Sequence, residues 1–151
     1  MLSKQASHAL KALLLLAADP QTWQSTPTLA RAQDLPEPML EQLLLRLRRA
    51  GLLVARRGRL GGYRLARATG QISLAAVLEA LQEPDSAVSP ISPNPEPSGP
   101  QPAAEQVTRA LEQRLERARL RALQELTLED LLFDLRSAEA SLGREGGLLV
   151  G

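Results

Sequence analysis

The stretch that most constrains the fold of this chain runs from residue 40 to residue 65, where a helical apolar pattern gives way to a hairpin pattern. Leucines recur at helical spacing up to Leu47, and Gly51 follows as a helix C-cap. Two short strand candidates, residues 52–55 and 63–66, then flank a turn that contains three glycines. Because a shorter helix is expected just upstream, at residues 28–33, the element order predicts a winged helix-turn-helix domain.

The chain as a whole is predicted to be mainly α-helical. It contains one Phe, one Trp and one Tyr, so leucine and alanine must build the core, and these residues favour helices. Helices are expected over residues 3–18, 28–33, 36–50, 72–81, 103–125 and 127–136, with Ser3, Thr28, Ser73 and Thr127 as N-caps. The predicted fold class is therefore mainly α with a small β-hairpin wing and a long C-terminal helix.

Prolines divide the chain into two parts. Seven of the eleven prolines lie between Pro84 and Pro102, mixed with serine and glycine, a composition that excludes a helix and buries little surface. We therefore expect a winged helix-turn-helix domain over residues 1–82, a proline-rich linker over 83–102, a dimerisation helix with a short final helix over 103–136, and a flexible tail over 137–151. The linker is interpreted either as a spacer or as a motif that docks a partner protein.

Positive charge is concentrated in the first half of the chain. Residues 1–70 carry 11 Lys or Arg against 4 Asp or Glu, whereas residues 71–151 carry 7 against 13. Eight arginines and no acidic residue fall between Arg46 and Arg67. A block of one charge is stabilised by a partner of the opposite sign, and a basic helix followed by a basic ribbon fits a DNA groove and its phosphates. The charge pattern therefore predicts double-stranded DNA as a partner.

The hairpin tip carries three of these arginines, Arg56, Arg57 and Arg59, with no acidic residue nearby. Surface arginines often belong to a solvated turn, which is one interpretation of the cluster. Contact with phosphates or with the minor groove is the other, and it is the prediction adopted for all three. The glycines between them permit a turn with positive φ, which serves either role.

Further DNA contacts are predicted on the helices. Arg46 and Arg49 share a face of the helix over residues 36–50 and are expected to contact phosphates, with a plain solvated face as the alternative; Arg48 lies well away from Arg46. Lys4 begins the first helix, where backbone N–H groups can meet a phosphate. Thr28, at the expected start of the short helix, is also assigned as a DNA contact.

The helix expected over residues 103–125 has apolar residues on two faces in its second half. One face is formed by Val107, Leu111, Leu115, Ala118 and Ala122. Leu120 and Leu123 fall on the opposite side. A solitary surface helix needs only one buried face, so one face is expected to pack on its own domain and the other on a second copy of the chain. The sequence therefore predicts a homodimer, with this segment as a long C-terminal dimerisation helix.

The chain contains no cysteine, which excludes disulfides, thiolate catalysis and metal sites built from thiolates. Its single histidine, His8, is expected to be a packed residue, with a ligand role as the alternative. No catalytic triad pattern or phosphate-cradling glycine motif is present, so neither an enzyme nor a cofactor is predicted. No apolar run reaches the ~20 residues of a membrane span, and an amphipathic helix explains the N-terminus better than a signal peptide does, so a cytoplasmic location is expected.

Three segments in a fixed order resemble a known family. They are Leu40-Glu41-Gln42-Leu43-Leu44 with Gly51-Leu52, then Arg57-Gly58 with Gly61-Gly62-Tyr63, then Ile72-Ser73-Leu74. Together they resemble the Rrf2 family of bacterial winged-helix transcriptional regulators, which includes IscR, NsrR and CymR. The likeness covers residues 1–82 well and residues 103–136 loosely. It implies a homodimer whose long helices pair, with one recognition helix in a major groove and one wing in the adjoining minor groove for each subunit.

The resemblance also assigns residues by position. It places Glu41 and Gln42 on the recognition helix, where members of the family contact base edges, and Arg57 in the wing, where members insert an arginine into the minor groove. Many members hold an iron–sulfur cluster through three cysteines; this chain has none, so an iron–sulfur sensor is not expected. Pro36 and Pro38 stand where small hydroxyl residues are common, so the operator sequence of relatives cannot be carried over.

Two functions are compatible with these features. The first is a homodimeric, sequence-specific DNA-binding transcriptional regulator, a repressor, that recognises a pseudo-palindromic operator. The alternative is a winged-helix module that docks a partner protein through its proline-rich segment. The unbroken arginine run favours the regulator, because a protein-binding wing has no general need for so much charge of one sign. Three options stay open for its regulation: a small molecule bound between domains, a partner protein, or no effector at all.

Overall fold

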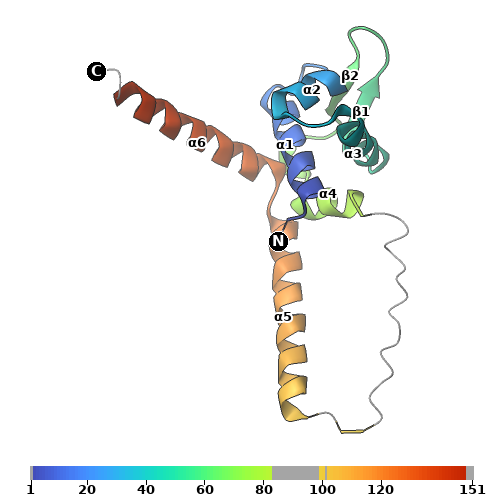
Figure 1. The fold of residues 1–151 in the computed structure, drawn as a ribbon, viewed down its shortest axis with the longest axis vertical. Coiled ribbons are helices and arrows are strands. Elements are labelled where there is room, and N and C mark those ends of the chain that lie inside the picture. The colour runs from blue at the N-terminus through green and yellow to red at the C-terminus, as the bar shows by residue number, and fades with distance from the viewer. Residues whose placement is uncertain (1, 83–98, 101, 149–151) are drawn as a thin grey trace.

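The structure, a computed structural model, describes residues 2–82, 99–100 and 102–148, and is mainly α-helical (Figure 1). Its elements are α1 (Lys4–Ala18), α2 (Thr26–Gln33), α3 (Glu37–Arg49), β1 (Leu53–Arg56), β2 (Gly62–Leu65), the 3-10 turn η1 (Thr69–Gln71), α4 (Leu74–Ala80), α5 (Ala103–Glu125) and α6 (Leu128–Leu148). The elements up to α4 form an N-terminal unit, and α5 and α6 leave it as two long arms. Most of the predicted linker lies outside the described residues.

Leucine and alanine form the core of the N-terminal unit, as their abundance predicts. α1 packs against α2, α3 and α4 and buries Leu13 and Leu16 at helical spacing. Ser3 is its N-cap, because the Ser3 Oγ accepts a hydrogen bond from the Ala6 N–H at 3.1 Å. His8 is half-buried on this helix, and its Nδ1 is buried without a hydrogen-bond partner among the described residues.

The helix-turn-helix consists of α2 and α3. The prediction that Thr28 caps α2 is wrong: the helix begins at Thr26, and the N-cap is Ser25, whose Oγ accepts from the Thr28 N–H at 3.3 Å. Pro27 fits this earlier start because proline is tolerated in the first helical turn. The turn that follows is formed at Asp34, which has the left-handed φ of 51°. α3 then buries Leu40, Leu43, Leu44 and Leu47 on its inner face.

The wing is the antiparallel pair β1–β2, in which Leu53 lies opposite Leu65 and Arg56 opposite Gly62. Each strand is displaced by one residue from its predicted position, because the ladder continues up to the Arg56–Gly62 pair at the turn. Gln24 adds a short third segment by bridging Tyr63 on the outer edge of β2. The loop before α2 is therefore tied to the wing.

The joint between α5 and α6 is fastened to the N-terminal unit. The Leu74 N–H donates to the Leu126 carbonyl at 2.9 Å, and the Leu128 N–H donates to the Ile72 carbonyl at 2.8 Å. α6 then packs on α1 and η1, where Leu128 and Leu132 are buried. The arms therefore originate from a fixed point on the N-terminal unit.

α6 is longer than the sequence predicts. Its end was expected near Arg136, with an irregular tail after it, whereas the helix extends to Leu148. Serine is accommodated inside it: the Ser137 hydroxyl donates to the Phe133 carbonyl and the Ser141 hydroxyl to the Ser137 carbonyl, both at 3.0 Å. The alanines and glutamates of this segment favour a helix, so its content of small residues was not sufficient to predict a flexible tail after Arg136.

Candidate nucleic-acid interface

The outer face of α3 carries the residues assigned to base contact. Glu41 and Gln42 are exposed, and so are Arg48 and Arg49. Each arginine follows one of these two residues by seven positions, which is nearly two helical turns, so the four side chains share one side of the helix. α3 therefore presents two polar side chains and two cations on the side away from the core.

Arg46 has a different environment. It is half-buried, and its Nη1 donates to the Leu81 carbonyl at 3.4 Å, at the C-terminal end of α4. A cation at the last carbonyls of a helix interacts favourably with the helix dipole. Arg46 therefore has a role inside the protein that its sequence position did not predict. Arg48 is the residue that the sequence analysis missed on the outer face, and its seven-residue distance from Glu41 was the available signal.

The wing tip presents two exposed arginines, Arg57 and Arg59, in the loop between β1 and β2. Arg56, at the end of β1, is also exposed, but its guanidinium donates to the Leu60 carbonyl at 2.6 Å and lies 4.7 Å from the centre of the Trp23 ring. The three predicted wing arginines are thus brought together, but Arg56 differs from the other two in its contacts within the protein.

Among the described residues, the exposed arginines Arg48, Arg49, Arg57 and Arg59 form no ion pair with a carboxylate. The pairs Arg109–Glu105 and Arg119–Glu116 lie instead on the exposed surface of α5. The positive charge of the α3 face and of the wing is therefore available for an anionic partner, which is the requirement for binding the phosphates of DNA.

The two remaining predicted contacts lie at helix starts. Lys4 is the first residue of α1 and is exposed. Thr28 is exposed in the first turn of α2, and its hydroxyl lies 2.8 Å from the Ser25 Oγ. Lys4 lies beside backbone N–H groups of the first turn of α1, which suits contact with a phosphate. The Thr28 N–H already donates to Ser25, so at Thr28 the hydroxyl is the group available for such a contact.

Glycine at position 62 is required by the close approach of the loop before α2. Its φ is 141°, and a Cβ there would lie 2.4 Å from the Gln24 carbonyl oxygen. Gln24 and Tyr63 exchange two backbone hydrogen bonds at this point, with N···O distances of 3.0 and 2.8 Å. A side chain at position 62 would therefore push the loop away from the wing.

We expect Gly62→Ala to destabilise the protein by about 2 kcal/mol more than Gly58→Ala. Both glycines have positive φ and share the cost of backbone strain, but nothing lies within 4 Å of a Cβ at Gly58. The extra cost at Gly62 is the loss of two backbone hydrogen bonds, at about 1 kcal/mol each. Urea unfolding followed by circular dichroism measures the difference, and equal stabilities would contradict the assigned role of the loop contact.

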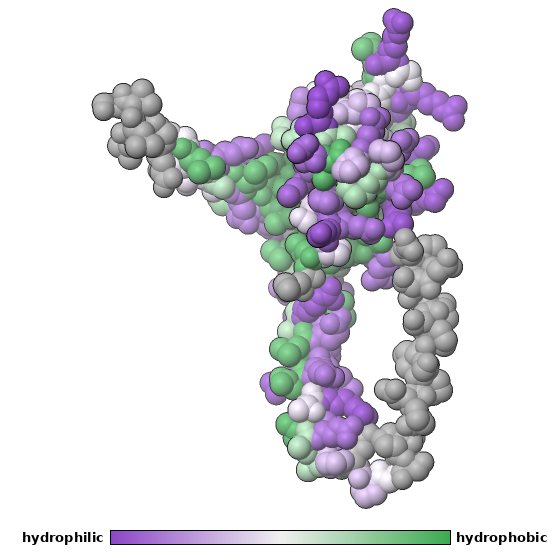
Figure 2. All heavy atoms as spheres, in the orientation of Figure 1, coloured by the Kyte–Doolittle hydropathy of each residue, from purple (hydrophilic) through white to green (hydrophobic). Residues whose placement is uncertain are grey.

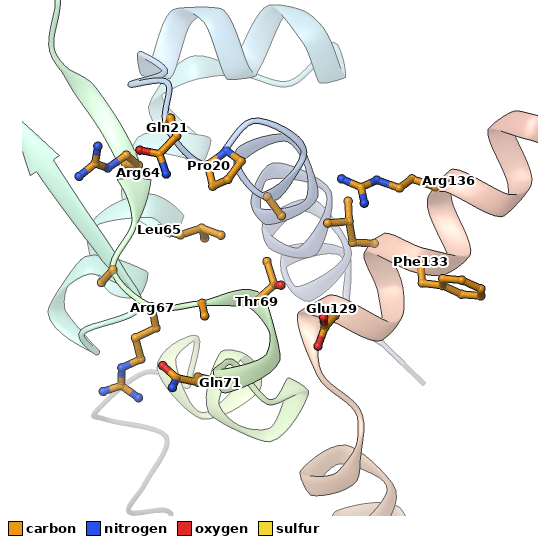
Figure 3. A pocket seen from close by; sticks show the side chains of 14 residues that line it. Pro20, Gln21, Arg64, Leu65, Arg67, Thr69, Gln71, Glu129, Phe133 and Arg136 are labelled. Carbon is orange, nitrogen blue, oxygen red and sulfur yellow. The ribbon is translucent and has the colours of Figure 1, made fainter.

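A cavity of about 760 Å³ opens between the N-terminal unit and α6 (Figure 3). Pro20 and Leu65 line one side, Thr69 and Gln71 the base, and Arg136 reaches in from α6. Its size is typical of small-molecule sites. The cavity thus offers a place for a small ligand between the wing side of the molecule and a C-terminal helix.

α5 presents an apolar stripe that nothing in the described chain covers. Val107, Leu111 and Leu115 are 67%, 51% and 61% exposed, and Ala118 and Ala122 continue the stripe as exposed residues. In Figure 2 the green spheres run along one edge of the α5 arm and the purple spheres along the other. Leu123, on a different side, packs against the core of the N-terminal unit. The helix therefore has one face on its own domain and one without a partner.

The helix-turn-helix, the basic wing and the uncovered arm together define a winged-helix DNA-binding protein. The chain belongs to the Rrf2 family: the family model, described as an iron-dependent transcriptional regulator, matches residues 2–134. Members are DNA-binding regulators rather than enzymes, and this chain is accordingly a DNA-binding transcriptional regulator. No helix within the described residues is long and apolar enough to cross a membrane.

Individual relatives agree with this assignment. The chain is 40% identical over 151 residues to slr0846 of Synechocystis sp., named as an HTH-type transcriptional regulator, with 99% of both chains covered. Among solved structures it is similar to IscR of T. potens, with a TM-score of 0.72, 27% identity, and 91% and 90% of the two chains covered. It is also similar to CymR of B. subtilis, the global cysteine regulator, with a TM-score of 0.69, 28% identity, and 87% and 95% coverage.

The iron dependence in the family description does not fit the side chains of this protein. The chain has no cysteine to ligate an iron–sulfur cluster. In the part of the chain that the structure covers, His, Asp and Glu side chains do not gather in groups of three or more that could hold a metal ion. The donor set for the family's iron chemistry is therefore missing from these residues.

Proposed function

We propose that the protein is a homodimeric repressor that recognises a pseudo-palindromic operator. The observation that carries this proposal is the set of exposed arginines on α3 and the wing, which no carboxylate of the described chain neutralises. Phosphate contacts supply most of the affinity of such a protein, and base contacts supply its specificity. A dimer bound across a promoter would block transcription from it, in the cytoplasm where bacterial DNA lies.

In this proposal α3 enters the major groove with Glu41 and Gln42 at the base edges. A glutamate accepts from the cytosine amino group, and a glutamine can pair with adenine through two hydrogen bonds. Arg48 and Arg49 then lie further along the same side of α3, in reach of the flanking phosphates. Lys4 and Thr28 add phosphate contacts at the starts of their helices.

The wing is proposed to lie in the adjoining minor groove. Arg57 and Arg59 project from its tip without a partner within the described residues, and a narrow minor groove attracts arginine through its negative potential. The apolar stripe of α5 would pair with the same stripe of a second copy, which sets the two α3 helices about one turn of DNA apart. The cavity beside α6 is the proposed site for a small-molecule effector.

The alternative, a module that docks a partner protein through the proline-rich segment, receives no support from the described residues. Most of that segment lies outside them. The exposed cations of α3 and the wing are better matched to a polyanion than to an ordinary protein surface.

Binding to DNA is expected to weaken steeply with salt. If roughly six phosphates are neutralised per dimer, the logarithm of the affinity should fall with a slope of about −5 against the logarithm of the salt concentration. Fluorescence anisotropy with the protein's own upstream region, titrated from low to physiological salt, measures this slope. A random duplex of equal length is the control. Affinity that is independent of salt, or equal for both duplexes, would rule out the proposed function.

A further inference from the structure

Trp23 is the only tryptophan of the chain, and the guanidinium groups of two wing arginines lie over its ring. The guanidinium carbon of Arg56 lies 4.7 Å from the centre of its ring, and that of Arg64 lies 4.6 Å from it. Both distances are well within the range of a cation–π interaction, for which tryptophan is the best aromatic partner. Trp23 itself is half-buried in the loop between α1 and α2.

The hairpin register explains why both arginines reach the same ring. Arg56 lies opposite Gly62, and Arg64 lies opposite Val54, two positions further along the same face of the ladder. Side chains alternate between the faces of a strand, so Arg56 and Arg64 project to one side of the hairpin. Two cations on one face repel each other, and the negative face of the indole ring offsets that repulsion.

The ring is held in place from the N-terminal unit. The next residue, Gln24, exchanges backbone hydrogen bonds with Tyr63, and its side-chain Nε2 donates to the Leu15 carbonyl of α1 at 3.1 Å. Ser25 follows as the N-cap of α2. Trp23 is therefore attached to α1, α2 and β2 through its neighbours, which makes its ring a fixed platform for the wing.

Arg56 connects the Trp23 ring to the wing loop. Its guanidinium also donates to the Leu60 carbonyl at 2.6 Å, across the loop that carries Arg57 and Arg59. A continuous set of contacts thus leads from α1 through Trp23 and Arg56 to the loop tip. Without the ring, Arg56 and the loop would lose a restraint, and binding would have to order them at a cost in affinity.

We propose that Trp23 is a positioning residue for DNA binding, which holds Arg56 and Arg64 on its ring and, through Arg56, holds the loop with Arg57 and Arg59 in the conformation that enters the minor groove. This inference rests on the proposed function, because it assigns a task to the wing of a DNA-binding protein. It also separates the wing arginines by role: Arg56 shapes the loop, and Arg57 and Arg59 contact DNA.

The test is a mutant cycle measured by fluorescence anisotropy with the upstream duplex. Trp23→Ala and Arg56→Ala should each weaken binding about tenfold, because either variant removes the Arg56–Trp23 contact from both subunits of a dimer. If Trp23 acts through Arg56, the double variant should bind no more weakly than the single variants, within about twofold. In a second cycle, Trp23→Ala is combined with Arg49→Ala on α3. The fold-losses of affinity from these two substitutions should multiply. Trp23→Phe keeps an aromatic face and should recover most of the affinity.

A second readout concerns the free protein. Because Trp23 is the only tryptophan, its emission should shift in Arg56→Ala and Arg64→Ala but not in Arg59→Ala at the loop tip. The positioning role would be overturned if Trp23→Ala bound DNA within about twofold of wild type, or if the losses of affinity multiplied in the Trp23–Arg56 double variant. Specific binding by the wild type would still support the proposed function in either case. Absence of specific binding by the wild type would instead refute the proposed function. If Trp23→Ala fails to fold, Trp23→Phe and the emission series decide the question.

Discussion

Replacing Arg57 and Arg59 together by alanine is expected to weaken operator binding about 1000-fold while leaving the dimer intact. The double variant removes four cations from a dimer, and each specific contact contributes about 1 kcal/mol or more, so the total loss is about 4 kcal/mol. The salt dependence should become shallower by about 1 for each phosphate contact removed. Anisotropy titrations at several salt concentrations measure both effects.

The matched control removes the same charge from elsewhere. Arg109 and Arg117 on α5 are both exposed, lie outside the winged-helix unit and face away from the apolar stripe. Their double alanine variant should bind within about threefold of wild type, because long-range charge alone is largely screened at physiological salt. A loss in the control as large as in the wing variant would mean that only net charge matters, and that the wing makes no direct contact.

The second large effect is expected from glutamates on the α5 stripe. Leu111→Glu with Leu115→Glu should convert the dimer to a monomer, because two charges per copy would face the apolar stripe of the partner. Both leucines are more than half exposed in the single chain, so its fold should persist. Loss of simultaneous binding to two half-sites should reduce operator affinity at least 100-fold. Sedimentation gives the oligomeric state, and anisotropy gives the affinity.

Two glutamines on the opposite side of the same helix provide the control. Gln113→Glu with Gln124→Glu adds the same charge at exposed positions away from the stripe. That variant should stay dimeric and bind DNA within a fewfold of wild type. A wild-type protein that sediments as a monomer, or a stripe variant that remains a dimer, would remove the basis for paired half-sites.

Most of the fold could be predicted because its signals are local. The buried leucines of α3 recur at helical spacing, Ser3 and Ser73 each accept a backbone N–H of their own first turn, and Gly51 has the positive φ of 79° expected after a helix. The start of α2 and the end of α6 were predicted wrongly. In both cases several residues could serve as the boundary, and propensity differences of a few tenths of a kcal/mol do not decide between them.

The candidate site was predictable as a region but not residue by residue. The run of arginines and the hairpin pattern are sufficient to predict a basic surface near residues 46–67. The separate roles of Arg46, Arg48 and Arg56 depend on neighbours that the sequence does not reveal. Arg46 donates to a carbonyl 35 positions away, and Arg56 stacks on a tryptophan from the loop before α2.

By itself the sequence determined the order of the helices, the glycine-bent wing, the positive first half and the apolar stripe of α5, since spacing, turn chemistry and charge act between near neighbours. Only the tertiary structure decided which arginines are engaged inside the protein and which remain exposed. That division follows from long-range packing, because a guanidinium binds whichever carbonyl or aromatic face the fold brings within a few ångströms of it.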